Sequence, residues 1–175
     1  MKVKKYHISI RIIHWLMAFL VIGMITSGIY MEDLDKDDSI RSLLYSLHKS
    51  FGVCVLLLFI VRILLRLITK TPPFPTIFPK AVVFITKAGH AILYVLMLVI
   101  PLSGVVMSNA AGYSVNIFGY ALPKIVETNK ELSHFAGEVH EILPLIMIAV
   151  LVAHIFAAFK HKIEGGEKNI MKRII

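Results

Sequence analysis

The chain has 175 residues, of which 57% are hydrophobic and only 17% are charged, with a formal net charge of +8. It is more apolar than a typical soluble domain, and this composition excludes a disordered chain, which contains few apolar residues. The single cysteine excludes a disulfide scaffold, and the length fits one domain over residues 1–175. A basic chain can indicate a nucleic-acid partner, but here the charges border long apolar segments. We therefore expect no nucleic acid and a chain surrounded by membrane lipid.

Four apolar segments are each long enough to cross a hydrocarbon core of about 30 Å. The first follows a basic N-terminus, but it is too long for a signal peptide and no small-residue cleavage site follows it. The third is followed by turn-forming residues between Asn109 and Pro123. Because none of these segments alternates in polarity, they predict an all-α integral membrane four-helix bundle. The predicted spans are approximately 11–31, 48–68, 88–108 and 138–160.

The charges that flank the spans alternate in sign along the chain. The N-terminus carries Lys2, Lys4, Lys5 and Arg11, and the first connection, which includes Lys36, sums to −3. The second connection sums to +5, the third to −2 and the C-terminal tail to +3. Because basic segments stay on the cytoplasmic side of a membrane, both termini are predicted to be cytoplasmic.

Four of the eight histidines stand out by their depth in the predicted spans, where ionisable residues are costly and are functional candidates by default. His14 and His154 lie near cytoplasmic ends, whereas His48 and His140 lie near outer ends. Because His140 and His154 are 14 residues apart, they share one helix face and are separated by about 21 Å along the axis. The pattern predicts two pairs at two depths, His14 with His154 and His48 with His140.

Two histidines that face each other across a bundle can hold one haem iron, so the pairs predict two haems stacked across the membrane for electron transfer. Gly52, one turn after His48, leaves room for a macrocycle. Two alternatives stay open: interfacial histidines without a ligand, and zinc, which prefers four ligands at one point and fits separated pairs less well. No hydrolytic or phosphate-binding motif is present, so no directly catalytic side chain is predicted.

Further histidines and arginines are candidates for contacts with haem propionates or with a quinone oxygen. Arg62 and Arg66 are one turn apart and could pair with propionates, or could extend to the membrane interface. The histidines of this group could equally be solvated at the membrane surface, and His134 is expected in a loop. The candidates are His7, Arg11, Arg62, Arg66, His90 and His161.

Short segments along essentially the whole chain resemble the bacterial cytochrome b561 family. They are Arg11-Ile-Ile-His14-Trp15, Leu47-His48-Lys-Ser-Phe-Gly52, Val61-Arg62-Ile-Leu-Leu-Arg66-Leu67, Gly89-His90-Ala-Ile-Leu-Tyr94, Pro101-Leu-Ser-Gly104, Phe118-Gly119 with Leu122-Pro123, and Val139-His140-Glu141 with His154 and His161. The resemblance implies two haem b groups with iron ligation by His14, His48, His140 and His154. It also implies a multi-pass cytochrome of the bacterial inner membrane that passes electrons between an outer donor and a membrane quinone.

One type of member in this family is a superoxide oxidase, and the resemblance implies a superoxide–quinone oxidoreductase with ubiquinone or another quinone as acceptor. The net acidic outer loops do not favour an anionic substrate, but Lys49, Lys124 and Lys130 could form a local positive patch. Two alternatives remain: a membrane-anchor subunit with a hydrogenase or dehydrogenase partner, and a histidine-lined metal transporter without haem.

Overall fold

The computed structural model describes residues 4–35 and 37–175, so Lys2 and Lys36 of the charge pattern lie outside the described residues. Its four long helices are each long and apolar enough to cross a membrane, which confirms the predicted all-α membrane bundle. Each predicted span lies within one helix, and the helices extend further at one or both ends. Their bounds are α1 Ile8–Glu32, α2 Arg41–Ile68, α3 Lys80–Ala110 and α4 Lys130–Glu164.

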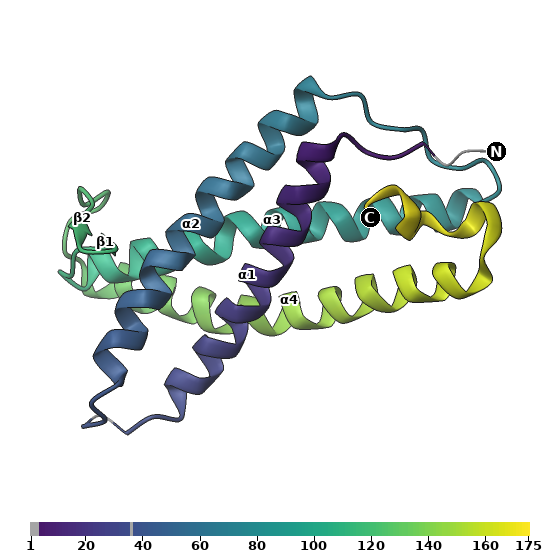
Figure 1. The fold of residues 1–175 in the computed structure, drawn as a ribbon. Helices are drawn as coiled ribbons and strands as arrows, with labels where there is room; N and C mark the ends of the chain where they lie inside the picture. The colour runs from purple at the N-terminus through teal and green to yellow at the C-terminus, as the bar shows by residue number, and fades with distance from the viewer. Residues whose placement is uncertain (1–3, 36) are drawn as a thin grey trace.

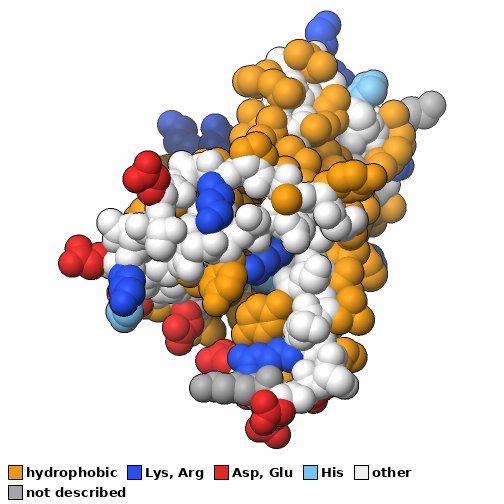
Figure 2. All heavy atoms as spheres, turned by 90° about the vertical axis from the view of Figure 1, so that its left-hand side faces the viewer, with side chains coloured by type: hydrophobic (Ala, Val, Ile, Leu, Met, Phe, Trp, Pro, Cys, Tyr) orange, Lys and Arg blue, Asp and Glu red, His pale blue; other side chains and the backbone are white. Residues whose placement is uncertain are grey.

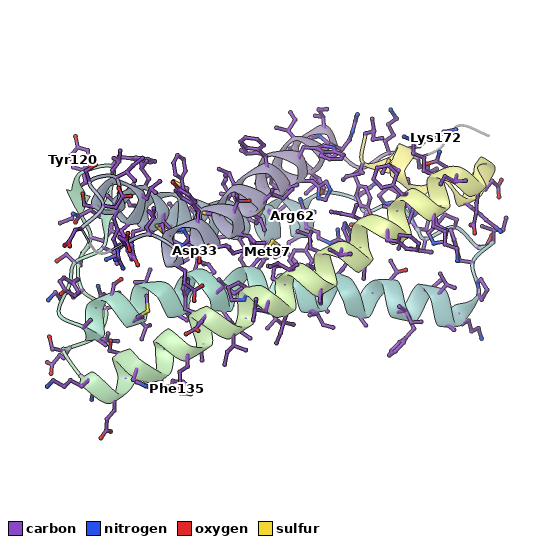
Figure 3. The ribbon with its side chains drawn as sticks, turned by 90° about the horizontal axis from the view of Figure 1, so that it is seen from below. Asp33, Arg62, Met97, Tyr120, Phe135 and Lys172 are labelled. Atoms are coloured by element: carbon purple, nitrogen blue, oxygen red, sulfur yellow. The ribbon has the colours of Figure 1, made fainter. Side chains whose placement is uncertain are left out.

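Consecutive helices run in opposite directions, so the bundle has two different ends (Figure 1). The hairpin end contains the α1–α2 connection and residues 111–129. The terminal end contains residues 4–7, the α2–α3 connection and residues 165–175. Figure 3 labels Tyr120 at the hairpin end and Lys172 at the terminal end.

The helices do not pack equally closely. Close backbone approaches join α1 to α2, α2 to α3 and α3 to α4, whereas α4 approaches neither α1 nor α2 comparably within the described residues. Ile13 and Met17 of α1 pack on Phe59 of α2, and Leu93 of α3 packs on Met147 of α4. α4 therefore faces α1 and α2 across a wider separation than that between neighbouring helices.

Most of the remaining large apolar side chains are exposed on the flanks of the bundle. This is expected for helices in lipid, because lipid tails are as apolar as the side chains and burial in protein is not required. Figure 2, viewed from the hairpin end, shows acidic and basic side chains gathered at this end and apolar side chains along the flank. The charge distribution thus separates the ends of the helices from their lipid-facing sides.

Residues 111–129 form a small cap over the hairpin end. β1 Asn116–Ile117 pairs antiparallel with β2 Tyr120–Ala121, and Phe118 in the turn between them has a positive φ of 46°. The buried hydroxyl of Ser50 in α2 accepts from the backbone N–H of Phe118 at 3.0 Å. Its single proton is within reach of two carbonyls, that of Ser46 at 2.9 Å and that of Asn116 at 3.1 Å. Ser50 therefore joins the strand pair to α2, two residues after His48.

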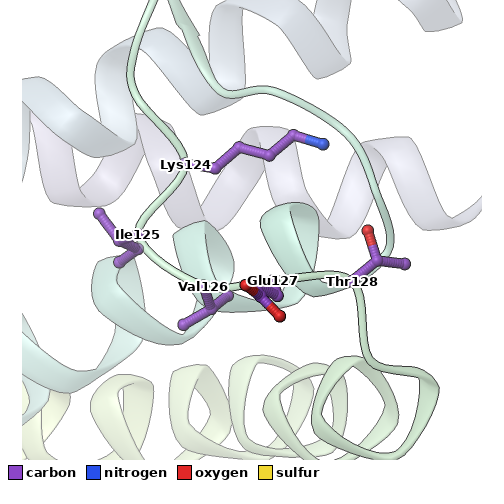
Figure 4. Close-up of a pocket in the computed structure, with 5 residues that line it drawn as sticks. All are labelled: Lys124, Ile125, Val126, Glu127 and Thr128. Carbon is purple, nitrogen blue, oxygen red and sulfur yellow. The ribbon is translucent and has the colours of Figure 1, made fainter.

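The cap is also joined to the end of α3. Asn109, expected in a turn, instead lies in the last turn of α3, where its amide donates to the carbonyl of Tyr113 at 3.1 Å. Its Oδ1 accepts from the backbone N–H of Ile125 at 2.9 Å. Lys124, which lines a hollow in this loop (Figure 4), donates from Nζ to the carbonyl of Gly112 at 2.7 Å. These bonds give a segment with little regular structure a defined conformation.

The terminal end is held by the last residues of the chain. Arg173 is buried and donates from Nη2 to the carbonyls of Pro72, at 2.6 Å, and Pro73, at 2.9 Å. The indole Nε1 of Trp15 donates to the carbonyl of Ile174 at 3.2 Å. The C-terminal segment thus joins α1 to the α2–α3 connection. This segment contains two 3-10 turns, η1 Gly166–Lys168 and η2 Ile170–Arg173.

Candidate functional site

The structure brings together the two members of each predicted histidine pair. The ring centres of His14 and His154 are 6.4 Å apart, with an interplanar angle of 65°. The ring centres of His48 and His140 are 6.2 Å apart, with an interplanar angle of 85°. Both pairs bridge the wide separation that α4 keeps from α1 and α2.

The ring separations suit one metal ion between each pair. A metal–imidazole bond is about 2 Å long and a ring centre lies about 1 Å beyond its bonding nitrogen, so two rings on opposite sides of one metal have centres about 6 Å apart. Within residues 4–35 and 37–175, no group of three or more histidine, cysteine or carboxylate side chains converges to hold a metal ion. The four histidines are therefore arranged as two separate pairs and not as one four-ligand zinc cluster.

The ring of His140 packs against α3, the helix that contributes no histidine to either pair. Its Nδ1 is 2.8 Å from the carbonyl oxygen of Ile100 and 3.3 Å from Ser103 Oγ. Because a carbonyl only accepts, Nδ1 carries the proton and Nε2 keeps a free lone pair for a metal. A Cβ atom on Gly104 would lie only 2.8 Å from His140 Cε1, so glycine is required where this ring meets α3.

His48 has a similar polar partner on α1. Ser27 donates its hydroxyl proton to the carbonyl of Met24 at 3.0 Å, so its oxygen accepts from His48 Nδ1 at 3.1 Å. A Cβ on Gly28 would touch the His48 ring at 3.5 Å, which is an ordinary contact. Gly52, expected to leave room for a macrocycle, faces the methyl group of Met24 instead, at 3.5 Å from the position of a Cβ atom.

The pair at the terminal end has different neighbours. Arg62 Nη2 lies 3.3 Å from His14 Nδ1, and Figure 3 shows Arg62 between the α1–α2 and α3–α4 layers. His90 packs against His154 with ring centres 5.2 Å apart, and its Nδ1 donates to the carbonyl of Thr86 at 2.7 Å. Of the additional histidines predicted from the sequence, His90 is thus placed directly beside a member of a pair.

Two arginines near the terminal-end pair have buried N–H groups, Arg11 Nε and Arg62 Nη1, that find no acceptor in the part of the chain that the structure describes. Buried donors in proteins are nearly always paired, so these two groups point to an acceptor supplied by a ligand. Carboxylates such as haem propionates match this chemistry. Arg66 is placed differently, because its guanidinium lies over the ring of Tyr6 at 5.9 Å. The residues present therefore fit a haem held by His14 and His154.

Other predicted histidines have partners outside the pairs. His161 contacts the Glu164 carboxylate at 3.1 Å and its ring centre lies 4.9 Å from that of Phe78. His7 caps the start of α1 by accepting from the backbone N–H of Ser9. The expectation that His134 lies in a loop is wrong: α4 begins earlier than predicted and includes it.

The residues that contact the rings of His48 and His140 were not predicted from the sequence. Ser103 and Gly104 belong to a segment that carried the family resemblance, but no role followed from it. Ser27 carried no signal, because a serine inside an apolar helix commonly bonds to its own backbone. Small residues at one level of two helices, α1 and α3, are the signal that could have indicated a ligand ring.

The structure thus combines four candidate membrane spans with two pairs of histidines, the arrangement predicted for a membrane cytochrome of the four-helix type. The sequence profile described as Prokaryotic cytochrome b561 matches residues 5–175. The chain is 32% identical over 160 residues to Cytochrome b561 homolog 2 of Escherichia coli (strain K12), covering 90% of this chain and 85% of the relative. It is 30% identical over 161 residues to Probable superoxide oxidase CybB of Yersinia pestis, covering 90% and 89%. Cytochrome b561 homolog 1 of Escherichia coli is 24% identical over 164 residues, covering 91% of each chain.

The chain belongs to the prokaryotic cytochrome b561 family, which confirms the resemblance found in the sequence. It is a multi-pass protein of the bacterial inner membrane, and its general function is electron transport by haem b within an oxidoreductase system. This membership disfavours the alternative of a histidine-lined metal transporter without haem.

Proposed function

We propose that residues 1–175 form a single di-haem domain that oxidises superoxide at the outer face of the membrane and reduces a quinone, ubiquinone or a related one, within it. The observation that carries this proposal is the presence of two histidine pairs, each with the ring separation expected for one metal. The superoxide assignment is supported by the relative named Probable superoxide oxidase CybB, which this chain matches over 90% of its length.

In this proposal His48 and His140 hold one haem b at the hairpin end, and His14 and His154 hold the other at the terminal end. A haem with two axial histidines supplies one-electron transfer. Ser27, Ile100 and Ser103 contact Nδ1 of the hairpin-end rings, which leaves Nε2 of each ring available to a metal. Arg11 and Arg62 offer unpaired N–H groups to the carboxylates of the terminal-end haem.

The hairpin end is proposed to face outward and the terminal end the cytoplasm. The basic second connection and C-terminal tail lie at the terminal end, whereas the net acidic first and third connections lie at the hairpin end. The positive-inside rule favours this orientation. Donor oxidation at the hairpin end would then be separated from the cytoplasm by the length of the bundle.

The proposed reaction balances in electrons and protons. Each superoxide anion gives up one electron and leaves as dioxygen. Two such electrons, together with two protons taken from the cytoplasm, convert one quinone into its quinol. The further candidates for a quinone contact lie at or toward the terminal end: His7, Arg66, His90 and His161. Of these, we propose His90 as the contact to a quinone oxygen, because it lies beside His154.

An anionic donor needs a local positive charge at the hairpin end, because the loops there are net acidic. Lys49 lines a cavity of about 200 Å³ together with hydroxyl groups of α2 and with residues of the cap. Lys124 contributes less to such a patch, because its ammonium group is bound to the carbonyl of Gly112. Lys49, the residue after His48, is therefore the proposed source of attraction for superoxide.

Two measurements test the proposal. The haem-to-protein ratio from a pyridine haemochrome spectrum is expected to be two, and a ratio of one would overturn the di-haem assignment. Stopped-flow mixing of the oxidised protein with superoxide is expected to reduce the haem, and added quinone is expected to reoxidise it. If superoxide leaves the haem oxidised in a protein with two haems, the donor assignment is wrong.

A membrane-anchor subunit is the second candidate function. The observation that favours it is the exposure of aromatic side chains on the cap, where Tyr113 is 67% and Tyr120 81% exposed. Aromatic residues are enriched at protein interfaces. Mild solubilisation followed by size-exclusion chromatography distinguishes the two: a dehydrogenase that stays bound supports the anchor role, whereas an active isolated chain supports the stand-alone enzyme.

A further inference from the structure

We infer that Arg62 raises the reduction potential at the terminal-end pair above that at the hairpin-end pair, so that the fold itself favours electron movement from the outer face inward. This inference rests on the proposed function for the presence of two haems, but it is independent of the identity of donor and acceptor. It follows from a difference between the groups that face the Nδ1 atoms of the histidines.

At the hairpin end, both rings face neutral oxygen atoms. His140 Nδ1 donates to the Ile100 carbonyl at 2.8 Å, and His48 Nδ1 donates to Ser27 Oγ at 3.1 Å. An acceptor at Nδ1 increases the basicity of the other ring nitrogen. A more basic ligand stabilises the more positively charged, oxidised iron, so this arrangement lowers the tendency of the hairpin-end site to hold an electron.

At the terminal end, a cation takes the place of these oxygens. Arg62 Nη2 lies 3.3 Å from His14 Nδ1, so a His14 that binds a metal through Nε2 has its Nδ1–H facing a cation instead of an acceptor. Arg62 Nη1 is buried and has no acceptor among the described residues. The second buried, unpaired N–H group, on Arg11, lies in the first turn of the helix that carries His14. Positive charge beside a site favours the state with one more electron, and it acts strongly where water is excluded.

Ligand basicity and local charge therefore both raise the reduction potential at the terminal-end pair relative to the hairpin-end pair. A unit charge beside a ligand ring changes the equilibrium constant for adding an electron by about tenfold or more in a partly buried site. Arg66 provides a matched comparison on the same helix, because its guanidinium lies over Tyr6 and not on a histidine. Arg62 acts on the site through His14. It is therefore a residue that places positive charge beside the ligand and not a catalytic residue.

The test is a potentiometric titration of the haem-loaded protein, followed in the visible spectrum. His140→Ala and His154→Ala variants assign the two one-electron steps, because each is expected to retain the haem of the other pair. We expect the higher potential at the terminal end. Arg62→Gln should lower it by about tenfold in the equilibrium constant, about 59 mV for a one-electron couple, with little change at the hairpin end.

Arg62→Lys retains the positive charge and should restore most of the shift, which a purely structural role of Arg62 would not predict. Arg66→Gln should shift the terminal-end potential less than Arg62→Gln. A terminal-end potential at or below the hairpin-end potential in the unmodified protein overturns the inference, even if Arg62→Gln fails to load haem. A chain that binds fewer than two haems contradicts the proposed function instead.

Discussion

Replacement of Gly104 by alanine is expected to remove the haem that we propose at the hairpin end while the haem that we propose at the terminal end stays bound. In the structure, the added Cβ would lie 2.8 Å from His140 Cε1 and 3.1 Å from His140 Nδ1. Carbon atoms in favourable contact are about 3.5–4.0 Å apart, so the ring would have to move by roughly 0.7 Å or more. That movement would disturb the 2.8 Å bond from Nδ1 to the Ile100 carbonyl and the spacing to His48.

The expected size of the effect follows from the cost of overpacking. An extra methyl group in a well-packed site costs about 1–3 kcal/mol, which corresponds to about a tenfold to hundredfold loss of haem affinity at this pair. The haem-to-protein ratio should therefore fall from two toward one. The stability of the helix itself should not fall, because alanine favours a helix over glycine by about 1 kcal/mol.

Gly23→Ala is the matched control, because a Cβ atom on Gly23 of α1 meets no atom within 4 Å. It should retain both haems and show an unchanged titration. Measurement of the haemochrome ratio and the redox titration on both variants decides the question. Full haem content with unchanged potentials in Gly104→Ala, or equal haem loss in both variants, would refute the proposed requirement for glycine where the His140 ring meets α3.

Three further changes test other parts of the structure. His140→Ala should remove the hairpin-end haem and retain the other, as measured by the haemochrome ratio; loss of both in a folded chain would show that the sites are not independent. Ser50→Ala should lower the free energy of unfolding by about 1–3 kcal/mol, because the Phe118 N–H loses its acceptor, with exposed Ser42→Ala as the control in thermal unfolding. Arg173→Ala removes the bonds to two proline carbonyls, so faster proteolysis of the C-terminal segment is expected, whereas Lys172→Ala should leave the rate unchanged.

Several features of the site could be predicted from the sequence because they depend on position along a helix axis. A residue advances by 1.5 Å along a helix, so the depths of His14, His48, His140 and His154 follow from where each span begins and ends. Matching those depths correctly predicts which histidines approach each other, with ring centres 6.4 and 6.2 Å apart. Their assignment as haem ligands stays a proposal.

Features that depend on helix rotation and on loop conformation were not predictable in the same way. Whether His90 approaches His154 depends on how α3 packs against α4, and the structure places their ring centres 5.2 Å apart. The partner of His161 depends on the α2–α3 connection, where its ring packs against Phe78. The strand pair of the cap is two residues long on each side. Such short strands have no periodicity that a sequence pattern can detect.

The sequence by itself thus determined that this basic, apolar chain crosses a membrane four times and carries histidines at two depths, because bilayer thickness and helix rise leave few other solutions. The tertiary structure decided the chemistry around each ring. Only packing brings the Ile100 carbonyl and Gly104 of α3 to His140, and the Arg62 guanidinium of α2 to His14. These contacts join residues tens of positions apart, and they depend on the lateral placement of helices, which axial spacing does not specify.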